Sequence, residues 1–183
     1  MTHATTVPSQ GALELADLSR SELVRRMRRG RRPDASALAG WEYLGLNTAR
    51  WLRTAGADRF VKGFGDGYGY NRRVRRGART APWIDAREPE PKPFAFYRVA
   101  EVDATARDNR YLNALLLDYS SYASSALDPA GRIRDFLVAL DDTHELLLGQ
   151  AFVAVGDLRL SASFFVIERF RERPSPVPAP PRR

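Results

Sequence analysis

The sequence of 183 residues contains no cysteine. Without thiols the chain cannot form disulfides, thiolate zinc sites or iron–sulfur ligation, and it has no cysteine nucleophile. This composition fits a reducing compartment, so the cytoplasm is the expected location. Only two histidines occur, His3 and His144, and neither has a partner at metal-ligand spacing. We therefore expect no metal and no cofactor.

Long apolar runs are missing as well. No window approaches the roughly 18 consecutive apolar residues of a membrane helix, and the first twenty residues lack the order of a secretory signal. Lysine is scarce: Lys62 and Lys92 are the two lysines, and arginine supplies nearly all the positive charge behind a net charge of +7. Arginines crowd into residues 25–32 and 72–76. These clusters suggest a nucleic-acid or anionic surface, or a GC-rich genome that favours arginine codons.

The domain plan follows from length and composition. Hydrophobic residues make up 44% of the chain, which suits one globular domain. We expect a flexible lead over residues 1–17, one β-barrel domain with N-terminal helices over 18–170, and a disordered Pro/Arg-rich tail over 171–183. Ser19 and Glu22 have the spacing of a capping box, which predicts a helix that ends at Gly30.

Eight segments have the composition of β-strands. They are residues 41–46, 59–64, 68–76, 94–103, 112–119, 132–140, 146–155 and 158–170. Glycine-containing turns at 65–67 and 156–157 indicate hairpins, and the last five strands follow one another with no helix between them. The pattern predicts a mainly β, eight-stranded antiparallel barrel with a short N-terminal helix and a second short helix over 48–55. The alternative is an open sheet wrapped round a long helix, which this sequence lacks.

Two features resemble the lipocalin-like, or calycin-type, β-barrel proteins. Gly40-Trp41 stands at the first strand, where lipocalins carry Gly-x-Trp, and Arg169 stands near the end of the last strand, where a basic residue stacks on that tryptophan. Residues 114–155 also resemble bacterial lipocalin-like domains, with ALLLDYS, IRDFLVALDD and ELLLGQAFV in order. The resemblance implies a barrel with an apolar pocket. Bacterial barrels of this class include carriers and cofactor-independent cyclases or isomerases of polyketide-like molecules.

Polar residues within apolar strands are the candidates for chemistry. Asp135 shares a strand face with Ile133 and Leu137, so an inward orientation would bury its carboxylate. Burial would raise the pKa of that carboxyl toward the range of a general acid or base. The structural alternative is that Asp135 faces solvent and pairs with an arginine, which is the commoner fate of a charged residue.

A cluster inside the barrel is the corresponding site hypothesis. The catalytic candidates are Asp135, Asp118 and Tyr97. Tyr119 and Tyr122 are further phenols next to strands, although most such tyrosines serve as core aromatics. The candidates for substrate binding are Gln150, Trp41, Trp83, Phe94, Phe96, Phe136, Phe152 and Phe164. A phenol or an amide in such a cluster can donate a hydrogen bond to a developing enolate.

The expected function is binding of an apolar small molecule in the barrel, as ligand or as substrate of a cyclase or isomerase in biosynthesis. Three alternatives stay open: a non-enzymatic carrier, a basic nucleic-acid or anionic-surface binder, and a partner protein that docks through its proline-rich tail. Nucleic acid is disfavoured, because no RRM, OB or helix-turn-helix signature is present. A homodimer is left open.

Overall fold

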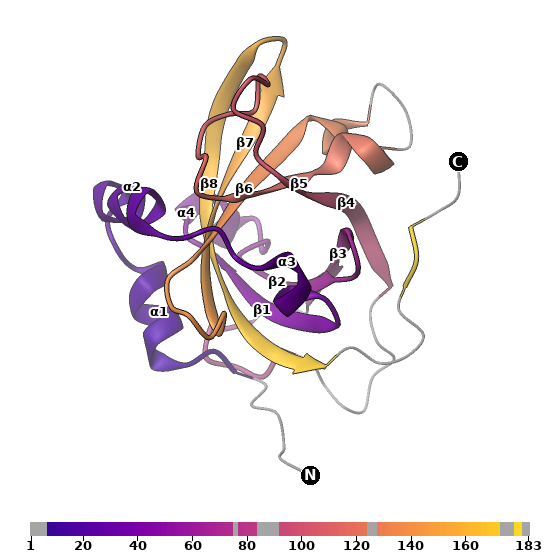
Figure 1. Cartoon of the computed structure of the whole chain (residues 1–183). Coiled ribbons are helices and arrows are strands. Elements are labelled where there is room, and N and C mark those ends of the chain that lie inside the picture. Colours follow the sequence, from indigo (N-terminus) through magenta and orange to yellow (C-terminus); the bar gives the residue numbers. More distant parts are fainter. Residues whose placement is uncertain (1–6, 75–76, 84–91, 124–127, 173–177, 181–183) are drawn as a thin grey trace.

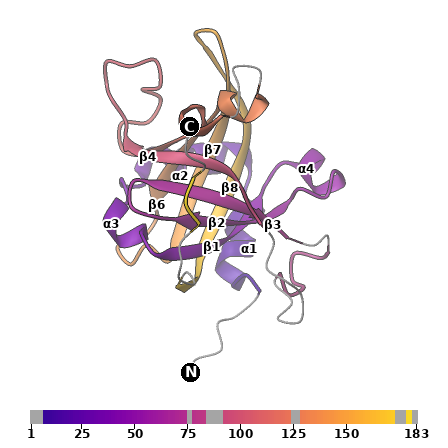
Figure 2. The same ribbon diagram turned by 90° about the vertical axis from the view of Figure 1, so that its right-hand side faces the viewer.

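Eight strands close into one antiparallel barrel in the computed structural model of the chain, which describes residues 7–74, 77–83, 92–123, 128–172 and 178–180 (Figure 1). The strands are β1 (Trp41–Asn47), β2 (Arg59–Phe64), β3 (Tyr68–Arg73), β4 (Pro93–Glu101), β5 (Leu115–Asp118), β6 (Ile133–Ala139), β7 (Leu146–Val155) and β8 (Leu158–Glu172). Each strand pairs with its neighbour in the sequence, and β1 pairs with β8 to complete the closure. The first four strands lie side by side in chain order in one wall (Figure 2).

Short helices precede and interrupt the barrel. They are α1 (Gln10–Ala16), α2 (Arg20–Arg29), α3 (Ala35–Leu38), α4 (Arg50–Thr54) and the 3₁₀ turns η1 (Tyr119–Tyr122) and η2 (Pro129–Arg132). The predicted capping box is present: the Ser19 side chain accepts from the Glu22 amide, and the Glu22 side chain accepts from the Ser19 amide. Among the described residues, no helix is both long and apolar enough to cross a membrane.

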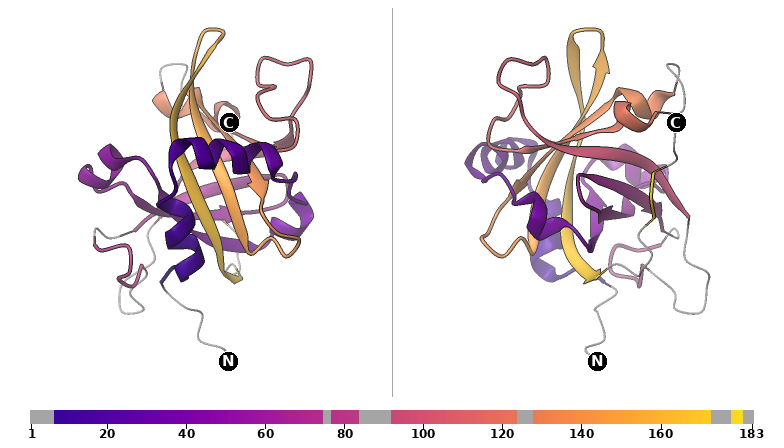
Figure 3. Two further views of the ribbon diagram at one scale, coloured as in Figure 1. Left: turned by 90° about the vertical axis from the view of Figure 1, so that its left-hand side faces the viewer. Right: turned by 45° about the vertical axis from the view of Figure 1, so that its right-hand side comes forward.

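The N-terminal helices α1 and α2 pack on the outside of the barrel, against β7 and β8 (Figure 3). Leu23 and Met27 of α2 are buried in this interface, while the arginines of the helix remain largely on its exposed side. The helix therefore covers apolar residues on the outer face of the barrel.

The wall of the barrel consequently separates two apolar clusters. The outer cluster contains Leu44, Phe136 and Val166 together with residues of α1 and α2. The inner cluster contains, among others, Tyr43, Phe64, Tyr97, Leu117, Leu137, Phe165 and Ile167. Side chains alternate between the faces along each strand, so β6 sends Phe136 outward and its neighbour Leu137 inward.

Most sequence expectations about the fold are confirmed. All eight strands form, the turn glycines Gly67 and Gly156 have positive φ angles of 72° and 58°, and the guanidinium of Arg169 lies 4.7 Å from the centroid of the Trp41 ring. Within the segment expected to be a flexible lead, residues Gln10–Ala16 instead form α1, with Ser9 as its N-cap. Most of the expected proline-rich tail lies outside the described residues, and the division into lead, barrel domain and tail stays a prediction.

Candidate functional site

A cavity of about 640 Å³ enters the barrel at the end where β1 finishes and β2 begins. Asn47, Arg73 and Phe94 stand at strand ends around its opening, which we call the mouth. The segment that follows α4 lines the same opening with small residues 55–57. Apolar side chains form the walls: Phe60, Ile133, Ala151 and Phe165. The cavity therefore has a mostly apolar lining with an entrance to solvent.

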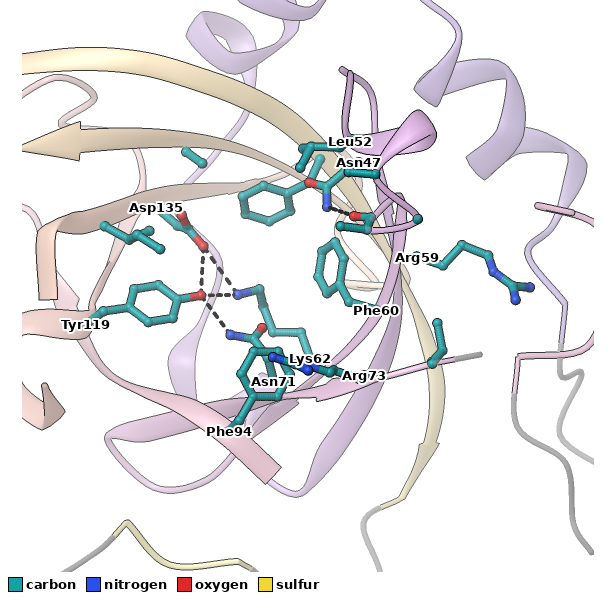
Figure 4. Close-up of a pocket in the computed structure, with 17 residues that line it drawn as sticks. Asn47, Leu52, Arg59, Phe60, Lys62, Asn71, Arg73, Phe94, Tyr119 and Asp135 are labelled. Atoms are coloured by element: carbon teal, nitrogen blue, oxygen red, sulfur yellow. Dashed lines mark hydrogen bonds and ion pairs between the residues drawn. The ribbon is translucent and has the colours of Figure 1, made fainter. Parts of the chain in front are cut away.

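Four polar side chains meet inside this cavity, and we call them the polar cluster (Figure 4). Lys62 Nζ lies 2.8 Å from the Tyr119 hydroxyl oxygen and 3.3 Å from Asp135 Oδ2. The Tyr119 hydroxyl donates to Asp135 Oδ2 at 3.0 Å and accepts from Asn71 Nδ2 at 3.1 Å. One phenol oxygen thus joins an amine, a carboxylate and an amide.

The strand pattern explains why these groups converge. Phe60, Lys62 and Phe64 alternate along β2, which directs the lysine inward with the two aromatic residues. Asp135 occupies the matching inward position on β6, between Ile133 and Leu137. The lysine and the aspartate are 73 residues apart in sequence, and closure of the barrel brings them together.

Tyr119 reaches the cluster because the chain turns into η1 directly after β5. Asp118 caps this turn by accepting hydrogen bonds from the amide and hydroxyl of Ser120. On the other side, Asn71 is fixed by a second hydrogen bond, from its Nδ2 to the carbonyl of Ala95 at 3.3 Å. Ala95 has a positive φ of 46°, an uncommon conformation for alanine. A strained backbone position therefore supports the cluster from β4.

Aromatic rings surround the Lys62 ammonium. Its Nζ lies 4.4 Å from the Tyr97 ring centroid, 5.3 Å from Phe165, 5.4 Å from Tyr119 and 5.7 Å from Phe60. These distances are within the range of cation–π attraction. We call this set of four rings the aromatic box.

Glycines on neighbouring strands make room for three rings of the aromatic box. Gly45 is paired with Phe60, Gly69 with Tyr97, and Gly149 with Phe165. A Cβ atom at any of these glycines would overlap the ring of its partner. The rings therefore lie against bare backbone, which is one reason why the sequence carries glycine inside strands.

Burial controls the electrostatics of the cluster. Lys62 is 1% exposed and Asp135 is 4% exposed. Burial lowers the pKa of Lys62, and the nearby Asp135 carboxylate offsets part of that change. Burial likewise raises the pKa of Asp135, against the opposing effects of Lys62 and of the Tyr119 hydrogen bond. Burial also raises the pKa of Tyr119 well above its ordinary value, and Asp135 adds to the increase.

The carboxylate of Asp135 has spare hydrogen-bonding capacity. Its Oδ2 is engaged by Lys62 and Tyr119, but its buried Oδ1 has no hydrogen-bond partner within the described part of the chain. A buried acceptor without a partner is costly.

The predicted site residues occupy several different places. Asp135 and Phe94 line the cavity. Tyr97 is inside the barrel and contributes a ring to the aromatic box, while its hydroxyl donates to the Gly63 carbonyl at 3.0 Å. Asp118 and Gln150 do not join the polar cluster. The expected grouping of Tyr97, Asp118, Asp135 and Gln150 is therefore corrected by the structure.

Local contacts explain why Asp118 and Gln150 lie outside the polar cluster. Asp118 ends β5, caps η1 and forms an ion pair with Arg134 at 3.1 Å. Gln150 lies on the outer face of the barrel, where its Oε1 accepts from the Tyr111 hydroxyl at 2.6 Å and its Nε2 donates to Ser161. Both side chains have structural partners outside the cavity.

The remaining aromatic candidates also lie away from the cavity lining. Phe136, Phe152 and Phe164 belong to the outer cluster beneath the helices. Trp41 contacts the inner cluster but stacks with Arg169, and Phe96 packs near Tyr70 and Tyr122. Trp83 is buried in the outer cluster, and its indole nitrogen donates to the carbonyl of Arg79.

Two members of the polar cluster, Lys62 and Asn71, were not predicted from the sequence. The available signal was composition: Lys62 is one of two lysines in an arginine-rich chain, and it sits between phenylalanines in strand alternation. Asn71 has a weaker signal, because asparagine is uncommon within strands.

A second buried charge cluster lies on the outer face of the barrel. Glu42 is fully buried and accepts from the Tyr70 hydroxyl at 2.7 Å. Its carboxylate also pairs with the Nε atoms of Arg72 at 2.9 Å and Arg171 at 2.8 Å. This group links β1, β3 and β8 beside the seam where the barrel closes. Arg72, one arginine of the cluster at residues 72–76, therefore has a structural role in the barrel.

Comparison with known protein families, curated proteins and solved structures finds no match to this chain. Within the described residues, no three His, Cys, Asp or Glu side chains gather as a metal site would require.

Proposed function

We propose that this protein binds a mostly apolar small molecule in the barrel cavity and transfers protons to and from a carbonyl-containing part of it. A cofactor-independent isomerase or cyclase acts in this way. The observation that carries the proposal is the buried Lys62–Asp135 pair, joined by Tyr119, inside an apolar cavity with an entrance.

The size and lining of the cavity support binding. Small-molecule sites commonly enclose about 300–1,000 Å³ and combine apolar walls with a few polar groups. The cavity falls in this range. The closed eight-stranded barrel is also compatible with a lipocalin-like fold, whose members hold a ligand in this position.

The composition of the polar cluster favours chemistry over simple carriage. A buried ion pair seldom stabilises a fold more than apolar residues of the same volume would, and groups with shifted pKa values concentrate at functional sites. A carrier needs only shape and one or two polar contacts. The cluster instead provides an acid, a base and a cation within hydrogen-bond distance of one another.

The roles follow from the geometry. Asp135 lines the cavity beside Lys62 and Tyr119, and we assign it as the base that accepts a proton from the carbon next to a carbonyl. Lys62 and the Tyr119 hydroxyl can stabilise the negative charge that develops on the carbonyl oxygen. The aromatic walls would hold the apolar part of the molecule. At the mouth, Arg73 is exposed beside Phe94 and offers a contact for an acidic group.

Binding is tested with anilinonaphthalenesulfonate, a fluorescent apolar anion, and with benzylacetone, an apolar ketone, as competitor. Ala151→Phe should fill the cavity and weaken binding of both probes. Ala154→Phe is the matched control, since Ala154 lies three residues along the same strand and outside the cavity lining. Equal binding by the wild-type protein and both variants would show that the cavity is not the site.

Proton transfer is tested by following the hydrogens next to the benzylacetone carbonyl in heavy water by NMR. We expect the wild-type protein to accelerate their exchange for deuterium and Asp135→Asn to reduce the acceleration by about 100-fold or more, which is typical for loss of a general base. Binding without exchange would identify the protein as a carrier.

A further inference from the structure

We propose that Lys62 acts as a nucleophilic amine that forms an imine with an aldehyde or ketone bound in the cavity. This inference rests on the proposed function, because it needs a carbonyl compound in the same cavity, and it assigns a covalent role to the lysine. It is carried by the position of Nζ beside a hydroxyl and a carboxylate, inside an apolar cavity.

The surroundings of the amine suit this reaction. Lysine becomes nucleophilic when an apolar environment favours its uncharged form. Here the side chain is 1% exposed and has rings of the aromatic box on several sides. Burial lowers the pKa of Lys62 and raises that of Asp135, so both shifts favour transfer of the proton from the amine to the carboxylate.

The aromatic box suits the product as well as the starting amine. A protonated imine is a cation at the same nitrogen, so it can keep the cation–π contacts and the Asp135 carboxylate that the ammonium has. The reaction therefore replaces one buried cation by another. No new charge has to be buried when the covalent bond forms.

The two neighbours of Nζ supply the proton transfers. The uncharged amine attacks the carbonyl carbon, a C–N bond forms, and the C=O electron pair moves to oxygen, which takes a proton from the Tyr119 hydroxyl. Asp135, which holds the proton released by the ammonium, restores the Tyr119 hydroxyl across the 3.0 Å between that hydroxyl and Oδ2. The nitrogen, now positively charged, gives one proton to the Asp135 carboxylate, and the same route through Tyr119 delivers that proton to the new hydroxyl group. The hydroxyl leaves as water while the nitrogen lone pair forms the C=N bond. The sum is ammonium plus carbonyl giving protonated imine plus water.

An imine would also assist the proposed proton transfer. The protonated C=N group withdraws electrons more strongly than a ketone, and the neighbouring C–H bond becomes more acidic. Asp135 then removes that proton to give an enamine, and reprotonation followed by hydrolysis releases the product. Asn71 acts as a positioning residue, since its Nδ2 fixes the Tyr119 hydroxyl at 3.1 Å.

The chain offers a direct test because it contains two lysines, Lys62 and the exposed Lys92. The wild-type protein is incubated with benzylacetone, reduced with sodium borohydride and digested, and the modified peptides are identified by mass spectrometry. An amine held in an apolar environment is a better nucleophile than one in water, because its uncharged form is favoured. We therefore expect modification of Lys62 at least about tenfold faster than that of Lys92.

Two variants complete the design. Lys92→Arg should leave the adduct unchanged, and Lys62→Arg should abolish it while keeping a cation in the box. The inference would be overturned if only Lys92 or the N-terminal amine were modified, or if folded protein gave no adduct. The wild-type digest alone decides this, so the test holds even if Lys62→Arg fails to fold. Exchange of benzylacetone hydrogens without a Lys62 adduct would leave the proposed function in place. Failure of benzylacetone to compete for the cavity would remove both.

Discussion

Replacing either Lys62 or Asp135 should make the free energy of unfolding depend on pH. The dependence should have opposite signs in the two single variants, because each leaves a different charged group buried. In Lys62→Met, Asp135 remains buried without its cation, so its pKa rises further above the ordinary 3.8. The folded state then retains a proton that the unfolded state has lost. The free energy of unfolding is therefore highest at low pH and falls as pH rises through the folded-state pKa.

The converse holds for Asp135→Asn. Lys62 loses the carboxylate that opposes desolvation, and its pKa falls further below the ordinary 10.5. Between the folded-state pKa and 10.5, the unfolded state binds the extra proton. The free energy of unfolding therefore rises with pH over this interval. The stability gained at high pH is lost again as the pH falls through the folded-state pKa.

The magnitudes follow from the burial of both side chains, which are 1% and 4% exposed. Removing one partner of such a pair typically costs about 3–5 kcal/mol at the pH where the other is charged, whereas replacing both is close to neutral. While one proton is exchanged, the slope reaches at most about 1.4 kcal/mol per pH unit.

Urea unfolding followed by tryptophan fluorescence at pH values of about 5 and about 9 measures these effects. The control is the double variant Lys62→Met/Asp135→Asn, which should be nearly independent of pH over this interval. Two results would refute the assignment of a buried, mutually stabilised pair. One is that the free energy of unfolding changes with pH in the same direction in both single variants. The other is that both single variants are as stable as the wild-type protein at both pH values.

Three further substitutions test other parts of the structure. Gly149→Ala should push the Phe165 ring into the cavity, cost about 1–3 kcal/mol of stability and weaken anilinonaphthalenesulfonate binding, as measured by titration. Glu42→Ala removes a fully buried carboxylate that pairs with Arg72 and Arg171, and it should lower the free energy of unfolding by about 3–5 kcal/mol. An unchanged free energy of unfolding in urea would contradict this structural role. Ser19→Ala removes the cap of α2 and should cost about 1 kcal/mol in thermal unfolding while benzylacetone binding stays unchanged.

The strands and their order were predictable because their signals are local. Alternation places Asp135 on the face of Ile133 and Leu137, and turn glycines mark the hairpins at Gly67 and Gly156. The capping box around Ser19 defines the start of α2 in the same way. Each of these features depends on residues a few positions apart.

Orientation was harder to predict wherever both faces of a strand are apolar. On β7 the outer face packs against α2, so Phe152 and Gln150 look like interior residues in the sequence although they face outward. Lys62 was missed for a different reason. Its partners, Tyr119 and Asp135, are 57 and 73 residues away and meet it only after the barrel closes.

The most direct measurement of the central claim is the NMR signal of the Lys62 side chain during ligand binding. Protein grown on lysine labelled at the ε-carbon and ε-nitrogen has one labelled side chain in the cavity and one, Lys92, exposed outside it. The Lys92→Arg spectrum assigns the two signals. Addition of benzylacetone should shift the Lys62 signal and leave the Lys92 signal in place. An unchanged Lys62 signal at saturating benzylacetone would contradict a ligand site at the Lys62–Asp135–Tyr119 cluster.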